Sequence, residues 1–97
     1  MAKGFLNFEI LERNTKKKVM IVLLLKNCVD NANSRILRKI IETYFEKSFK
    51  SEKRIYVAFD IDGEDRELVE SILFEYEYKL MRMELKESNI PIKFYIL

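Results

Sequence analysis

Seven consecutive apolar residues, Val19 to Leu25, constrain the fold of this chain more than any other feature of its sequence. Lysines bound the run on both sides, Lys18 before it and Lys26 after it. A run this short cannot cross a bilayer, which takes about 20 residues, so no membrane association is predicted. Its β-branched residues and the turn signals beside it favour a central strand that is buried on both faces. We expect the rest of the chain to cover this strand.

The composition is that of one small α/β domain formed by residues 1–97. Hydrophobic residues make up 48% of the chain, which contains only two Gly and one Pro. There is no His and a single Cys, Cys28, so His-based catalysis, His-ligated zinc and an internal disulfide are excluded. The lone Cys favours a reducing compartment, and we predict a cytoplasmic, non-enzymatic protein without a cofactor. The charged share of 35%, rich in Lys and Glu, is typical of thermophile proteins.

Charge is divided unevenly along the chain. Residues 1–54 carry 13 Lys and Arg against 6 Asp and Glu, a net charge of +7, whereas residues 55–97 carry 5 against 10, a net charge of −5. This division indicates a basic face for a polyanion, two copies that pair head to tail, or two halves that complement each other within one fold.

Hydrophobic periodicity predicts the order strand, strand, helix, strand, helix, strand, strand. The expected ranges are strands over 5–12 and 19–25, a helix from about 31 to 49, a strand over 55–61, a helix from 64, and strands over 81–87 and 92–97. A helix that continues to Glu87 is the alternative for the stretch 81–87. The predicted fold class is a two-layer α+β sandwich with two helices on one face of a five-stranded mixed sheet, in the order ββαβαββ. A ferredoxin-like arrangement is the alternative.

One stretch resembles a catalytic motif. Phe59-Asp60-Ile61-Asp62-Gly63 is similar to the first motif of the haloacid dehalogenase-type phosphohydrolases, an apolar strand that ends in Asp-x-Asp-Gly. The resemblance implies a nucleophile at Asp60, a general acid/base at Asp62 and a bound Mg²⁺. It covers five residues, Glu64 stands where the family has Thr, and the 34 residues after Gly63 are too few for the remaining motifs. We predict no catalytic residue and interpret Asp62 as a helix cap.

The same acidic stretch has a second interpretation. Asp60, Asp62 and Asp65 cluster around the predicted start of a helix, and carboxylates are the preferred ligands of hard divalent cations. An adventitious metal site at these three residues is therefore a further candidate, although clustered acids at a helix start are usually caps.

The outer side of the second predicted helix carries apolar side chains. Phe74 and Tyr78 lie four residues apart, opposite the side expected to be buried, and Met81 follows if the helix continues. Phe, Tyr and Met are enriched in protein interfaces, and glutamates surround this stripe. We predict that the three residues form an interface, for a homodimer, a larger homo-oligomer or a protein partner. The sheet face away from the helices offers a second route to association, because the central run would otherwise leave half its side chains in water.

Nucleic-acid binding is the alternative function. From Lys16 onward the order of elements is similar to that of the archaeal chromatin protein Alba and of the C-terminal domain of translation initiation factor three, both basic α/β modules. The candidates for phosphate contacts are Lys16, Lys17, Lys18, Arg35 and Lys39. The near-neutral total charge and the lack of aromatic residues among these cations make this function less favoured than protein association.

Overall fold

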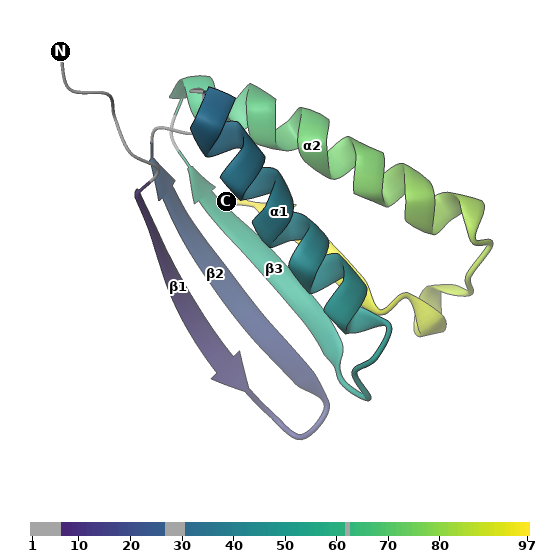
Figure 1. Ribbon diagram of the computed structural model, residues 1–97. Helices are drawn as coiled ribbons and strands as arrows, with labels where there is room; N and C mark the ends of the chain where they lie inside the picture. The colour runs from purple at the N-terminus through teal and green to yellow at the C-terminus, as the bar shows by residue number, and fades with distance from the viewer. Residues whose placement is uncertain (1–6, 27–30, 62) are drawn as a thin grey trace, which may run out of the picture.

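The computed structural model describes residues 7–26, 31–61 and 63–97 of the chain, which form four strands and two long helices (Figure 1). In chain order the elements are β1 (Asn7–Asn14), β2 (Lys18–Lys26), α1 (Asn31–Ser48), β3 (Arg54–Ile61), α2 (Gly63–Arg82), a short 3-10 helix η1 (Glu87–Asn89) and β4 (Ile92–Ile96). No helix within these ranges is both long and apolar enough to cross a membrane.

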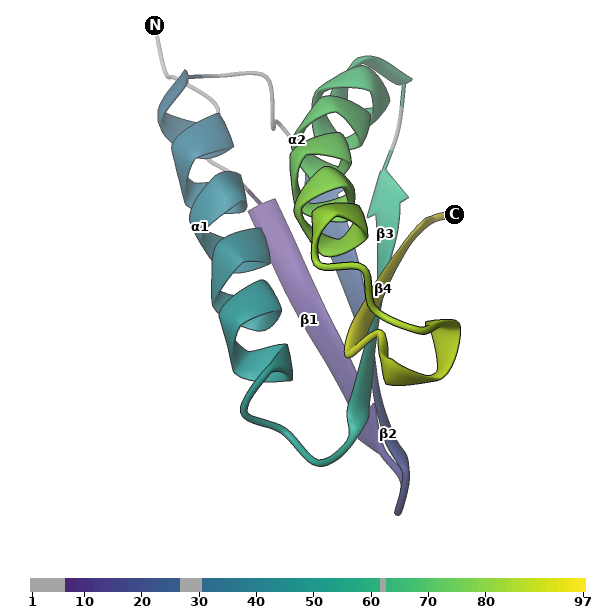
Figure 2. The same cartoon turned by 90° about the vertical axis from the view of Figure 1, so that its right-hand side faces the viewer.

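The strands lie in the sheet in their order along the chain, β1-β2-β3-β4. β1 and β2 form an antiparallel hairpin, whereas β2, β3 and β4 are parallel. The connections through α1 and α2 step across the sheet in the same direction, so right-handed crossovers place both helices on one face. Figure 2 shows both helices on that face and no helix on the other. The predicted class, two helices on one face of a mixed sheet, is confirmed.

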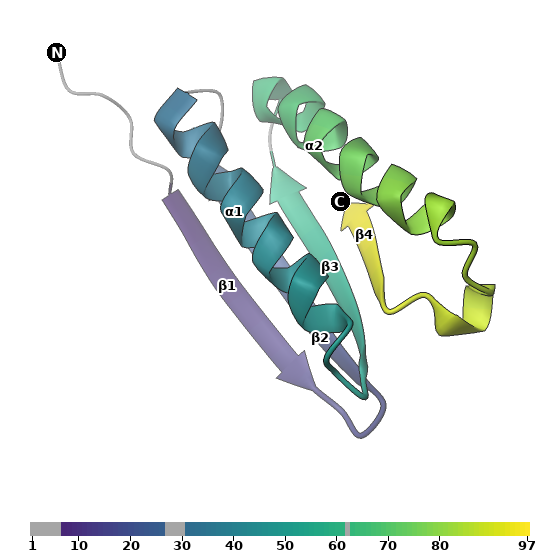
Figure 3. The same ribbon diagram turned by 45° about the vertical axis from the view of Figure 1, so that its right-hand side comes forward.

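The ferredoxin-like alternative is wrong. In that arrangement another strand separates the two parallel strands of each β-α-β unit. Here β2 and β3 are direct neighbours, and so are β3 and β4, which lies at one edge of the sheet (Figure 3).

The predicted strand over 81–87 is also wrong, so the described part of the chain has four strands instead of five. The helical alternative for this stretch is correct as far as Arg82. The helix then ends at a turn in which Glu84 has a φ of 52° and donates its N–H to the Met81 carbonyl, 3.1 Å away. No Gly or Pro marks this turn in the sequence, and the side chain of Leu85 packs against the core from a loop.

The hydrophobic core fills the space between the sheet and the helices. Strands and helices contribute Ile21, Leu23, Leu25, Ile55, Val57, Phe59, Ile61, Ile92, Leu37, Ile41, Val69, Ile72, Leu73, Tyr76 and Leu80. In β2 and β3 these are alternate residues, as expected when one sheet face is covered. The prediction that the central strand is buried on both faces is therefore wrong within a single chain, because its other side chains lie on the face without helices.

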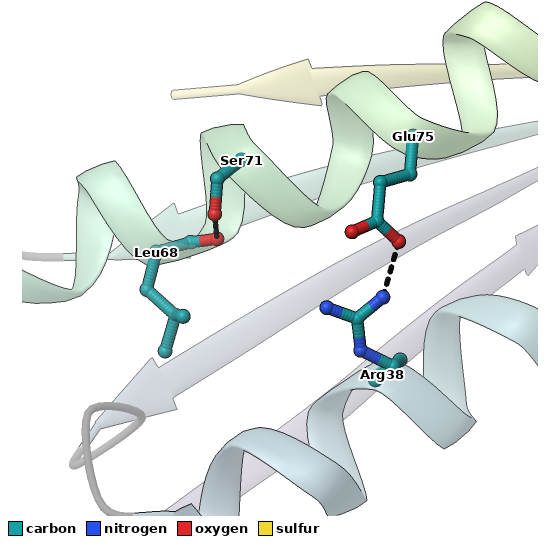
Figure 4. A network of polar contacts seen from close by, with 4 residues as sticks. All are labelled: Arg38, Leu68, Ser71 and Glu75. Atoms are coloured by element: carbon teal, nitrogen blue, oxygen red, sulfur yellow. Dashed lines mark hydrogen bonds and ion pairs between the residues drawn. The ribbon is translucent and has the colours of Figure 1, made fainter.

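One ion pair on the exposed side of the helical layer joins α1 to α2 (Figure 4). The Arg38 guanidinium of α1 donates to the Glu75 carboxylate of α2, and both side chains are about half exposed. In α2 the Ser71 hydroxyl donates to the Leu68 carbonyl at 2.8 Å. The two helices are thus linked directly as well as through the core.

Candidate functional site

The sheet face without helices is the first candidate surface, and we call it the open sheet face. Strand register arranges the middle of this face in three rows across the sheet, with Lys18 and Arg54 paired before them and Lys26 after them. Along the chain direction of β2 the rows are Arg13, Met20, Tyr56 and Lys93; then Leu11, Val22, Ala58 and Tyr95; then Glu9, Leu24 and Asp60. Alternation places these residues opposite the core side of each strand, so no described helix covers them.

The centre of the open sheet face is apolar and accessible. Leu11, Met20 and Tyr95 keep 50%, 44% and 45% of their surface exposed, while Val22 and Leu24 between them are partly buried by their neighbours. A continuous apolar surface across several strands is uncommon on a monomer that has no partner.

The two ends of the open sheet face differ in charge. Four cations lie toward the start of the parallel strands: Arg13, Lys18, Arg54 and Lys93. The opposite end carries the acids Glu9 and Asp60, together with one cation, Lys26. Antiparallel pairing of β1 with β2 contributes to this separation, because it brings Arg13 to the start of β2 and Glu9 toward its end.

Two tyrosines stack within the open sheet face. The ring centroids of Tyr56 and Tyr95 are 6.3 Å apart, with 17° between the ring planes, and Lys18 Nζ lies 5.8 Å from the centre of the Tyr56 ring. Sequence reasoning missed this pair, since the two residues are 39 positions apart and only the β3–β4 register brings them together.

The second candidate surface includes the predicted interface residues of α2. Phe74, Tyr78 and Met81 are 68%, 46% and 67% exposed, so the outer stripe exists as predicted from its spacing. The Arg82 guanidinium lies 5.8 Å from the centre of the Tyr78 ring and covers part of it. That this stripe is an interface stays a prediction.

A groove adjoins the stripe where the C-terminal half of α2 faces β4. Its volume is about 520 Å³, and it is lined by Glu77, Leu80, Met81, Leu85, Ile90, Ile92, Lys93, Phe94 and Tyr95. Met81 belongs to both features, so we treat the stripe and the groove as one α2–β4 surface. The turn at Glu84 folds the following residues back beside α2. Their place in the groove therefore depends on this turn, and no local sequence pattern marks them.

Strand β4 adds unused backbone groups to the α2–β4 surface. Pro91 accepts a hydrogen bond from the Ile55 N–H, and the Leu97 N–H donates to Phe59, each at 2.9 Å. Alternate residues of a strand bond to the same neighbour, so the N–H and C=O groups of Ile92, Phe94 and Ile96 point away from β3. β4 is last in the described sheet, and no described strand pairs with this edge.

The predicted phosphate-binding residues are not brought together. Lys16 and Lys17 lie in the β1–β2 turn and Lys18 begins β2, whereas Arg35 and Lys39 lie in the N-terminal half of α1. α1 runs antiparallel to β2, so the two groups lie at opposite ends of the sheet (Figure 1). The strands instead group Lys18 with cations that the sequence did not single out.

The acidic residues of the phosphohydrolase-like stretch separate as well. Asp60 is exposed on the open sheet face, and Asp65 is buried on the inner side of α2. Asp62 lies outside the described residues, so the cation site at these three residues stays a prediction. Within the part of the chain that is described, no three Asp, Glu, Cys or His side chains are grouped to hold a metal ion.

These features define a two-layer α/β arrangement that has two accessible apolar surfaces, which meet at β4, where Lys93 and Tyr95 contribute to both. No protein-family model, curated protein or solved structure matches the chain. The open sheet face and the α2–β4 surface are therefore the candidate functional sites of this chain.

Proposed function

We propose that this chain is a non-enzymatic, cytoplasmic protein that works by association with other polypeptides. The observation that carries the proposal is the α2–β4 surface, where an apolar groove lies beside a sheet edge with free backbone groups. Its ligand is an extended segment of a partner protein, added to β4 as a fifth strand.

The edge of β4 supplies the backbone part of this binding. Ile92, Phe94 and Ile96 offer alternating N–H and C=O groups over the length of the strand, which is the template that strand addition requires. The side chains of the same three residues face the helical layer, so side chains of an added strand would lie next to the groove.

The groove supplies the side-chain part. Leu80, Met81, Leu85 and Phe94 form an apolar lining, and its volume of about 520 Å³ is large enough for several partner side chains. Glu77 and Lys93, which have opposite charges, both line the groove. A charged side chain of either sign on the bound segment can therefore form an ion pair there. We expect every second residue of the bound segment to be apolar.

Selection from a displayed library of random peptides tests this function. Selected peptides should show alternating apolar residues, and their binding should shift the amide resonances of Ile92, Phe94 and Ile96. Met81→Asp should weaken binding at least about tenfold, because it places a charge in the groove. The matched control is Ile36→Asp, since Ile36 is 47% exposed on the other helix. Peptides that bind Met81→Asp as well as the unchanged chain would exclude the α2–β4 surface.

Nucleic-acid binding is a second candidate because of one observation, the stacked Tyr56 and Tyr95 beside Lys18 on the open sheet face. Aromatic rings on a sheet stack with unpaired bases, and nearby cations contact phosphates. Anisotropy of labelled single-stranded RNA and duplex DNA at low and high salt tests it. Salt-sensitive binding that Tyr56→Ala and Lys93→Ser both weaken would support this function, and an absence of binding at low salt would exclude it.

A further inference from the structure

We infer that the open sheet face is the interface of a homodimer, in which two copies pack sheet on sheet with their strands antiparallel. The two-fold axis lies between the sheets and runs across the strands, so the middle row of Leu11, Val22, Ala58 and Tyr95 packs on its own copy. This inference does not depend on the partner proposed for the α2–β4 surface, although Lys93 and Tyr95 line the groove as well as the open sheet face.

The apolar centre provides the contact area. Strands about 4.8 Å apart with about 3.3 Å per residue give a four-stranded face of roughly 500 Å² in each copy. Two copies together would bury about 1,000 Å², which is at the lower limit for specific interfaces. Leu11, Met20, Val22 and Leu24 would change from water to packed contact, and the central strand would become buried on both faces.

The charges select the orientation of the two copies. In the antiparallel arrangement β1 lies over the partner's β1, so Arg13 meets the partner's Glu9. At the next strands Met20 meets the partner's Leu24, and Tyr56 with the neighbouring Arg54 meets the partner's Asp60. An isologous interface repeats each of these contacts twice, which is what a self-complementary surface requires.

The parallel arrangement of the two copies is disfavoured. An axis along the strands would place the basic end, which has four cations and no acid, on the basic end of the partner. The antiparallel arrangement leaves one like-charge approach, between Lys18 and the partner's Lys26. Both lie at the ends of β2, where long lysine side chains can reach solvent.

A nucleic acid fits this face less well than a second copy does. The aliphatic centre of Leu11, Met20, Val22 and Leu24 offers no ring for base stacking and no donor for phosphate. Glu9 and Asp60 would repel a phosphate backbone that extended along the strands. Both acids find partners when the occupant is the same face of another copy.

Light scattering behind size exclusion measures the dimer directly, over a dilution series. The unchanged chain should show twice the monomer mass and dissociate on dilution. Val22→Arg, at the centre of the middle row, should give a monomer that still unfolds cooperatively, whereas Ile36→Arg on α1 should leave the dimer intact. A monomer at all concentrations, or a dimer that Val22→Arg leaves intact, would overturn the inference.

A charge swap on β1 tests the orientation. Arg13→Glu alone and Glu9→Arg alone should each weaken the dimer by about tenfold or more, because like charges then meet twice. The double variant Glu9→Arg with Arg13→Glu should restore it, since each position again meets its opposite in the partner. Failure of the double variant to recover would overturn the antiparallel arrangement. A chain that stays monomeric at all concentrations but binds labelled single-stranded RNA in a manner weakened by Tyr56→Ala would instead assign this face to nucleic acid.

The two proposals fail separately. Loss of peptide binding in Met81→Asp with an intact dimer tests the α2–β4 surface only. Loss of the dimer in Val22→Arg with intact peptide binding tests the open sheet face only.

Discussion

Tyr95 and Ile92 lie three residues apart in β4 on opposite faces of the sheet, and their exposed fractions are 45% and 1%. Ile92 packs in the core beneath α2, while Tyr95 stacks on Tyr56 on the open sheet face. One short strand thus contributes to fold stability through one side and to a candidate interface through the other. Substitutions at these two positions should separate the two contributions.

We expect Ile92→Ala to lower the free energy of unfolding by about 2–5 kcal/mol, the range for a fully buried aliphatic side chain. Tyr95→Ala should cost less, about 1 kcal/mol, since it removes one aromatic contact from a side chain that is already 45% exposed. Urea denaturation in the Val22→Arg background, which is expected to be monomeric, measures both. Equal losses at the two positions would contradict the assignment of the two faces.

The ion pair between Arg38 and Glu75 should contribute little to stability. Its side chains are 46% and 51% exposed, and exposed pairs contribute about 0–1 kcal/mol. The hydrogen bond to Glu75 raises the pKa of Arg38 above its usual value, so Arg38 stays charged. A double-mutant cycle with Arg38→Gln and Glu75→Gln should give a coupling energy below about 1 kcal/mol that decreases with salt.

The pair of Arg66 and Glu70, one turn apart in α2 with 3.3 Å between Nε and Oε1, is the matched control. Its coupling energy should be about 0.3–0.5 kcal/mol, as for other helical pairs at this spacing. A coupling above about 2 kcal/mol for Arg38 and Glu75 would show that the pair is a main link between the helices.

Glu84→Gly should stabilise the fold by about 0.5–1 kcal/mol. Glu84 has a φ of 52°, a conformation that costs residues with a Cβ about 1–2 kcal/mol and glycine much less. Part of the gain is offset by the greater freedom of glycine in the unfolded chain. Glu84→Ala is the control, because it removes the charge and keeps the strain. A glycine variant no more stable than the alanine variant in thermal denaturation would contradict this account.

Burial of Tyr76 should make the fold sensitive to alkaline pH. Burial raises the pKa of the Tyr76 phenol above its usual value of 10, with a smaller contribution from the charge of Glu42. The unfolded chain therefore loses this proton first, so the free energy of unfolding is unaffected below pH 10 and falls as the pH rises above it.

Tyr76→Phe should make this alkaline loss smaller, as measured by urea denaturation at a series of pH values. Tyr78→Phe is the control, since Tyr78 lies on the outer side of the same helix and is 46% exposed. If both variants lose stability above pH 10 as steeply as the unchanged chain, burial of Tyr76 is not a cause of the alkaline loss.

Periodicity in the sequence predicted most of the architecture. The spacing of apolar residues in α2 correctly separated a buried side, with Ile72 at 1% exposure and Tyr76 at 3%, from an outer stripe with Phe74 at 68%. Helix spacing alone sets which residues share a side, so this prediction needed no tertiary information. The same reasoning failed at the end of α2, where Glu84 reverses the chain without a glycine.

The candidate surfaces could be predicted only in part. Met81 was identified from its spacing, but the groove around it depends on where the loop after Glu84 places Leu85 and Phe94. The basic candidates Lys18 and Arg35 are separated because α1 runs antiparallel to β2. Hydrophobic periodicity identifies the two elements but does not show which of their residues lie close together.

The sequence by itself determined what depends on local spacing: the order of the elements as far as the second helix, and the apolar side of each helix. It also determined what the chain lacks, above all histidine and a second cysteine. Tertiary structure decided which residues meet across the parallel strands, because register pairs positions far apart in the chain, such as Met20 with Tyr56 and Tyr56 with Lys93. The opposite charges at the two ends of the open sheet face arise from that pairing, since each strand contributes only one or two of them.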